Sequence, residues 1–81
     1  MRQELLAARG LLAEHKKRYR DLDMEASGLV VLIRSIVSPY EADISEIRID
    51  EAAASIKRLR EIIHEMRALR ENIKTLEADL G

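Results

Sequence analysis

Aliphatic residues recur along the first half of the chain at alternating spacings of three and four positions. Counted in heptads, position a is held by Leu5, Leu12, Tyr19, Ala26 and Ile33, and position d by Ala8, His15, Leu22, Leu29 and Ile36. A stripe of this kind is typical of a helix that packs along one partner helix. The spacing predicts a helix over about residues 2–37.

The same spacing returns in the second half. Position a is held by Ala52, Leu59, Met66, Ile73 and Leu80, and position d by Ser55, Ile62, Leu69 and Leu76. Position e adds a third apolar row, which consists of Ile49, Ile56 and Ile63. The spacing predicts a second helix over about residues 50–80, and Asp50 is the residue type that favours its N-cap position.

The connection between these helices, about residues 38–49, contains the only proline, Pro39. Proline cannot continue a helix, and it disfavours helical geometry at the residue before it. Asp43 and Glu46 have the spacing of a capping box, which makes Asp43 an alternative start for the second helix. Two long amphipathic helices joined by a short connection pack antiparallel. The prediction is an all-α single domain over residues 1–81, a two-helix antiparallel coiled-coil hairpin.

The apolar stripe broadens at the end of the hairpin that carries the connection. In the segment 28–37, GLVVLIRSIV, only Arg34 and Ser35 interrupt the apolar run. A narrow stripe needs one partner helix, but a broad face needs more than one. We therefore expect further helices to cover this end. A second copy, giving a homodimeric four-helix bundle, is favoured over a different protein partner.

The favoured function is a non-catalytic protein–protein interaction or assembly module, built on this self-associating hairpin. The residues expected at its interface are Leu29, Val30, Leu32, Ile33, Ile36, Val37, Ile49, Ile56, Leu59 and Ile63. Pro39 and Tyr40 are the expected exposed recognition feature at the turn. Gly28 weakens its helix by about 1 kcal/mol relative to alanine. We expect the close approach of a neighbouring helix to explain it, and the alternative is a flexible joint.

Two registers of the hairpin agree with the pattern. The first sets Tyr19 opposite Ile62 and requires a tight turn after Val37. Its charge pairs are Arg18 with Glu65, Glu25 with Arg58 and Arg9 with Glu77. The second is shifted by one heptad and allows a loop that runs to Ile49. Its charge pairs are Lys16 with Glu77 and Asp23 with Arg70. Exposed ion pairs contribute too little to decide between them.

Composition narrows the class of protein. The 81 residues include 14 basic and 15 acidic side chains and no cysteine, with 36% charged and 2% aromatic residues. Such a profile is typical of long helices, and it excludes disulfides and thiolate metal sites. The balanced net charge favours neither nucleic acid nor a cationic partner. With no signal-peptide pattern and no apolar stretch of about 20 residues, we expect a cytoplasmic protein that does not enter a membrane.

A basic run carries the alternative hypothesis, a small nucleic-acid-associated regulatory protein. The run consists of Lys16, Lys17, Arg18 and Arg20. Basic clusters beside an aromatic residue can bind phosphate backbones. However, Tyr19 lies at position a and is predicted to point into the seam, and acidic residues are spaced for i,i+4 pairs with the run. The pattern favours a solvated helix face.

The two histidines are the remaining candidates for chemistry. Glu61 and His64 have the Glu-x-x-His spacing of di-iron bundles, but they lie at positions c and f, away from the seam. We therefore expect no metal and no cofactor. His15 lies at position d, where a polar residue can help to fix register; the alternative is a pH sensor whose protonation destabilises the seam. No nucleophile–base set or phosphate loop is present, so no catalysis is expected.

Overall fold

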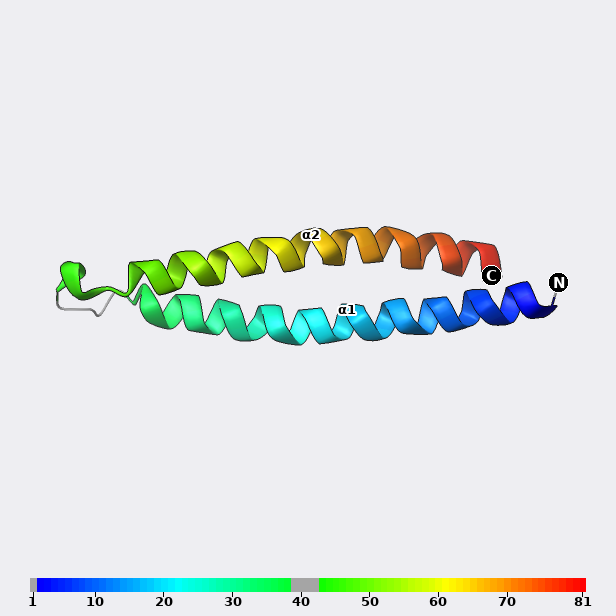
Figure 1. Cartoon of the computed structure of the whole chain (residues 1–81), viewed down its shortest axis with the longest axis horizontal. Coiled ribbons are helices and arrows are strands. Elements are labelled where there is room, and N and C mark those ends of the chain that lie inside the picture. The colour runs from blue at the N-terminus through cyan, green and yellow to red at the C-terminus, as the bar shows by residue number, and fades with distance from the viewer. Residues whose placement is uncertain (1, 39–42) are drawn as a thin grey trace.

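The computed structural model describes residues 2–38 and 43–81, which form an antiparallel pair of long helices (Figure 1). Helix α1 spans Arg2–Ile36, the short 3-10 helix η1 spans Ile44–Glu46, and α2 spans Ile49–Leu80. The prediction of an all-α helical hairpin is confirmed. The hairpin measures 64 × 15 × 15 Å, and both termini lie at the end opposite η1.

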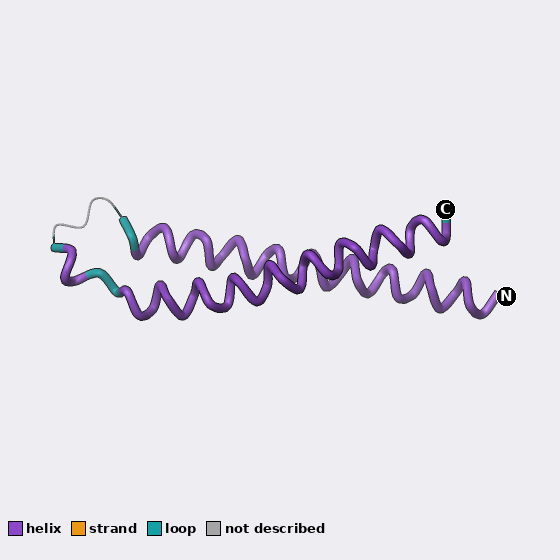
Figure 2. Tube along the Cα trace, turned by 90° about the horizontal axis from the view of Figure 1, so that it is seen from above, coloured by secondary structure: helices purple, strands orange, loops and turns teal. Residues whose placement is uncertain are grey.

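The two helices wind around each other, since they lie side by side in Figure 1 and cross near the middle in Figure 2. Their shape is far from compact. The radius of gyration is 18.4 Å, whereas a compact chain of this length has one of about 12 Å. The long thin shape leaves most side chains in contact with solvent.

The buried residues follow the predicted a and d rows. Leu22 and Ile62 are each 1% exposed and, with Leu69, form the centre of the core. Tyr19, Ala26, Leu29 and Met66 pack against them, and Ile36, Ala52 and Ser55 are buried nearer η1. Leu5 departs from the pattern, because it is exposed near the end where α1 projects beyond α2 (Figure 1).

The N-caps of the helices in and after the connection differ from those predicted. Asp43 caps η1, where its Oδ1 accepts from the Ser45 backbone N–H at 3.0 Å and from its Oγ at 2.6 Å. These hydrogen bonds lower the pKa of Asp43. The N-cap of α2 is Arg48, without a side-chain capping bond, so the prediction of Asp50 as N-cap is wrong. Asp50 lies in the first turn, where its charge still favours the helix dipole.

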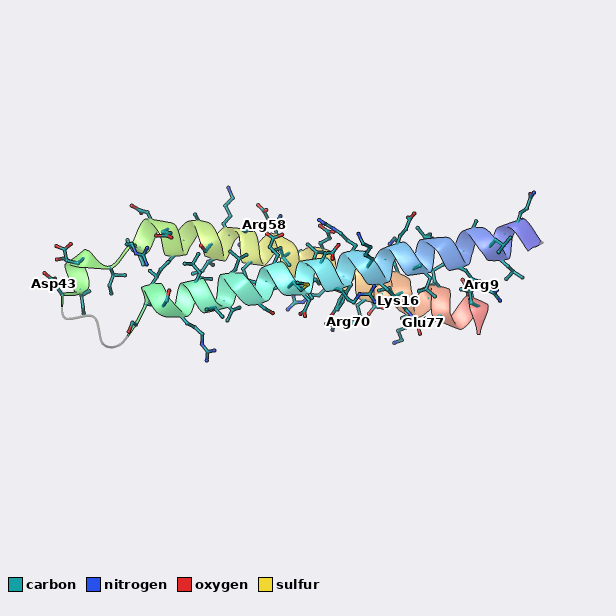
Figure 3. The ribbon with its side chains drawn as sticks, turned by 90° about the horizontal axis from the view of Figure 1, so that it is seen from below. Arg9, Lys16, Asp43, Arg58, Arg70 and Glu77 are labelled. Atoms are coloured by element: carbon teal, nitrogen blue, oxygen red, sulfur yellow. The ribbon has the colours of Figure 1, made fainter. Side chains whose placement is uncertain are left out.

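Charge pairs from both predicted registers are present. Arg18 pairs with Glu65 and Arg58 with Glu25, as in the first register. Lys16 Nζ lies 3.9 Å from Glu77 Oε1, as in the second (Figure 3). The first register also requires a tight turn after Val37, whereas α2 begins only at Ile49, as the second register allows. Long basic side chains reach along the helix axis, which is why charge pairs could not separate registers one heptad apart.

Gly28 does not mark a close approach between α1 and α2. A Cβ atom added to Gly28 meets no other atom within 4 Å. The expectation of a closely packed neighbouring helix is therefore wrong within the hairpin. Gly28 lies at position c, on a face of α1 turned away from the seam.

Candidate interaction surface

The seam divides the surface of the hairpin into two flanks. Positions g and c of both helices form one flank, on which Arg18 and Glu65 meet across the seam. Positions e and b form the other flank, on which Lys16 and Glu77 meet near the termini. We call them the ion-pair flank and the aliphatic flank.

The ion-pair flank is closed by two double hydrogen bonds between the helices. Arg18 donates from Nε and Nη2 to the Glu65 carboxylate, at 2.6 and 3.1 Å. Arg58 donates in the same way to Glu25, at 2.6 and 2.9 Å. The hydrogen bonds from Arg58 lower the pKa of Glu25, and those from Arg18 lower the pKa of Glu65. Paired, oriented charges of this kind make the ion-pair flank a polar surface.

The aliphatic flank differs, because the residues at position e near η1 are aliphatic and exposed. They are Val30 (39% exposed), Val37 (48%), Ile49 (62%), Ile56 (51%) and Ile63 (36%). Val30 and Ile63 line one shallow hollow across the seam. Ile56 and Ile63 line a neighbouring hollow on α2. All five side chains share position e near η1 and come from both helices, and we call them the aliphatic patch.

The other residues predicted for the interface expose less surface to solvent, because they are already partly or fully buried within the hairpin. Leu29, Leu32, Ile33 and Leu59 are half-buried, and Ile36 is buried within the hairpin. Leu32 lies at position g and therefore on the ion-pair flank. Of the predicted interface residues, the exposed ones thus lie on a single flank. Pro39 and Tyr40 fall outside the described residues.

Charges separate between the two flanks, although the net charge is only −1. By heptad position, the aliphatic flank carries Arg9, Lys16, Arg20, Arg34, Arg60, Arg67, Arg70 and Lys74 against Asp23 and Glu77. The ion-pair flank carries Glu4, Glu14, Asp21, Glu25, Glu51, Glu61, Glu65 and Asp79 against Arg18 and Arg58. The net charge conceals this separation, and sequence reasoning that used the net charge missed it. Summing charge along each heptad row would have revealed it.

The basic run of the alternative hypothesis is divided between different faces. Lys17 pairs with Asp21 within α1 at 3.7 Å, while Lys16 and Arg18 pair with acidic residues of α2 on opposite flanks. Arg20 has no ion pair among residues 2–38 and 43–81. Tyr19 is half-buried, and its hydroxyl accepts from Arg70 Nη2 at 3.3 Å. The ring is therefore unavailable for stacking on a base.

The histidines lie apart from each other. His15 is half-buried and lines a hollow with Asn72 and Thr75; its pH-sensing role stays a prediction. His64 is exposed beside the aliphatic patch, and Glu61 Oε2 lies 3.5 Å from Arg58 Nη1. Within the described part of the chain, no group of three or more His, Cys, Asp or Glu side chains could hold a metal ion.

Two further findings bear on function. Neither α1 nor α2 contains a stretch that is long and apolar enough to cross a membrane. No protein-family model, curated protein or solved structure matches the chain.

Proposed function

We propose that this chain is a non-catalytic protein–protein interaction module that self-associates through the aliphatic patch. The observation that carries the proposal is the row of five exposed aliphatic side chains, supplied by both helices on one flank. Full burial of an aliphatic side chain is worth about 1.5–3 kcal/mol. In a lone hairpin these side chains stay partly in water. Contact with further helices would bury them and add much of this free energy to the stability of the assembly.

The surface area of the hairpin supports association. Its solvent-accessible surface is 6568 Å², whereas a compact monomer of the same mass exposes about 5,000 Å². The excess, roughly 1,500 Å² for one chain, is larger than the area of about 800 Å² that a standard protein–protein interface buries on each partner. The elongated hairpin therefore has area to bury in a dimer while its own seam stays intact.

A second copy is the proposed partner, because identical patches can cover each other in a closed two-fold dimer. The four helices would pack as a bundle only over the aliphatic patch. Toward the termini the residues at position e are charged, as at Lys16, Asp23 and Glu77. There a narrow a/d stripe needs only one partner helix, so the two-helix arrangement would continue alone.

Two adjacent valines provide the matched test. Val30 lies in the aliphatic patch, whereas Val31 is 66% exposed at position f, away from the seam and the patch. Sedimentation equilibrium should give a dimer for the unmodified chain and for Val31→Asp, and a helical monomer for Val30→Asp. Dimers of equal stability in both variants would contradict the proposal, as would equal dissociation of both.

The nucleic-acid hypothesis has less support. Lys16, Lys17 and Arg18 each lie within 4.0 Å of an acidic side chain. Their charge is therefore partly compensated within the hairpin. Arg20 alone of the four has no acidic partner in the described part of the chain. A gel shift with nucleic acid at moderate salt discriminates between the two functions.

A further inference from the structure

The charges of the hairpin are also distributed unevenly along its length. Its tip, residues 43–51, carries Asp43, Glu46, Asp50 and Glu51 against a single basic residue, Arg48, and all five are exposed. Arg48 Nη1 lies 3.0 Å from Glu51 Oε2, so this charge is already paired. Asp43, labelled in Figure 3, lies at the extreme end of the molecule. The tip is therefore acidic.

The middle of the aliphatic flank has the opposite charge. Arg60 and Arg67 line the hollow that contains Ile56 and Ile63. With Arg20 and Lys74 they form what we call the basic band, beside the aliphatic patch and beyond it toward the termini. All four side chains are exposed, and none has an ion pair within residues 2–38 and 43–81. The basic band thus has charge available for a partner.

Two orientations would allow a second copy to cover the aliphatic patch. In a parallel arrangement, the two acidic tips would lie side by side, and so would the two basic bands. Like charges placed opposite each other disfavour such a pairing. In an antiparallel arrangement centred on the patch, each tip would extend past the patch of the other copy and reach its basic band.

We propose that two copies of this chain associate antiparallel through the aliphatic patch, with the acidic tip of each against the basic band of the other. The proposal rests on the self-association proposed above. The aliphatic patch supplies the contact area, and the charges of tip and band select the orientation. The terminal halves of the two hairpins then project in opposite directions, so the dimer is longer than the 64 Å of one hairpin.

A distance between the two copies tests the orientation. The chain has no cysteine, so Ala78→Cys introduces a single spin-label site near the C-terminus, at an exposed position f. In the antiparallel dimer, pulsed electron spin resonance should give a distance on the order of 60 Å between labels, from the helical rise on either side of the two-fold axis. In a parallel dimer the labels would lie within about 30 Å. A short distance in a dimer of confirmed mass overturns the orientation alone, whereas a folded monomer overturns the self-association as well.

Charge reversal tests the contact between tip and band. Glu46→Lys with Asp50→Lys, or Arg60→Glu with Arg67→Glu, should each raise the dissociation constant of the dimer by about tenfold or more. Combining both pairs should restore it to within about threefold. The matched control is Glu71→Lys with Asp79→Lys, which changes the net charge equally but far from the tip, and should change the constant less. Failure of the combined variant to recover would overturn the charge pairing.

Discussion

Arg58 and Glu25 are joined across the seam by two hydrogen bonds, of 2.6 and 2.9 Å. One heptad further along, Arg18 and Glu65 repeat the arrangement with the direction of donation reversed between the helices. Each helix therefore supplies one arginine and one glutamate to the ion-pair flank. The opposite flank has no such closure near η1, where its position e residues are aliphatic. The two flanks therefore differ in character, and the proposed self-association uses the aliphatic one.

The two glutamates predict how stability depends on pH. Their pKa values are lowered from the ordinary 4.5 by the hydrogen bonds from arginine. A lowered pKa in the folded state contributes stability that is present above the ordinary value and is lost as pH falls through the folded value. The melting temperature should therefore fall as pH is lowered from 5 to below 4.

A double variant isolates this contribution. Glu25→Gln with Glu65→Gln should flatten the acid dependence of the melting temperature, measured by circular dichroism. Glu14→Gln, on the same flank but without an ion pair in the described part of the chain, should leave it nearly unchanged. An acid dependence that is equally steep in the double variant and the unmodified chain would contradict this account.

Gly28 predicts a stabilising substitution. A methyl group at this position meets no other atom within 4 Å, and alanine favours a helix interior over glycine by about 1 kcal/mol. Gly28→Ala should therefore raise the melting temperature by roughly 4–8 °C for a domain of this size. Gly10→Ala, at a position with equally open surroundings, should behave alike. A loss of stability in Gly28→Ala alone would indicate that another chain packs against this face.

We expect truncation of Leu22 to cause the largest loss of folding stability of any single substitution described. Leu22 is 1% exposed at the centre of the seam, whereas Leu6 on the same helix is 66% exposed. Truncation of a buried leucine to alanine costs about 2–5 kcal/mol. Leu22→Ala should shift the urea midpoint strongly downward or unfold the chain, and Leu6→Ala should shift it little. Similar midpoints for both variants would mean that the seam is not where the core lies.

The heptad pattern predicted the helices and the seam because burial repeats along the helix with the same period as the a and d rows. Leu22, Ile62 and Leu69 are buried as that pattern predicts. The pattern could not predict the cap of α2, because Arg48 occupies it without a side-chain hydrogen bond. The pattern also could not predict the structural role of Gly28, because the space around a residue depends on which other residues pack against it.

The candidate surface was only partly predictable. The five residues of the aliphatic patch were all named, but so was Ile36, which is buried within the hairpin. A broad apolar face on a single helix does not say which of its rows the partner helix covers. The sign of the charge around the patch was missed because acidic and basic residues nearly cancel over the whole chain, although they occupy different heptad rows.

Binding to nucleic acid is predicted to be weak. We expect no retained complex in a gel shift with duplex DNA or single-stranded RNA at 150 mM salt, because three of the four residues of the basic run have acidic partners. Binding carried by phosphate contacts weakens steeply as salt rises. A complex at moderate salt that is lost in Arg20→Glu would favour the nucleic-acid function instead.

Self-association is best tested by the mass of the unmodified chain in solution, measured by sedimentation equilibrium at neutral pH. We expect twice the 9.3 kDa of one chain, with the helical circular dichroism of a folded hairpin. A folded, helical species that stays at 9.3 kDa as protein concentration is raised would contradict self-association, because the aliphatic patch would then be stable in water without a second copy.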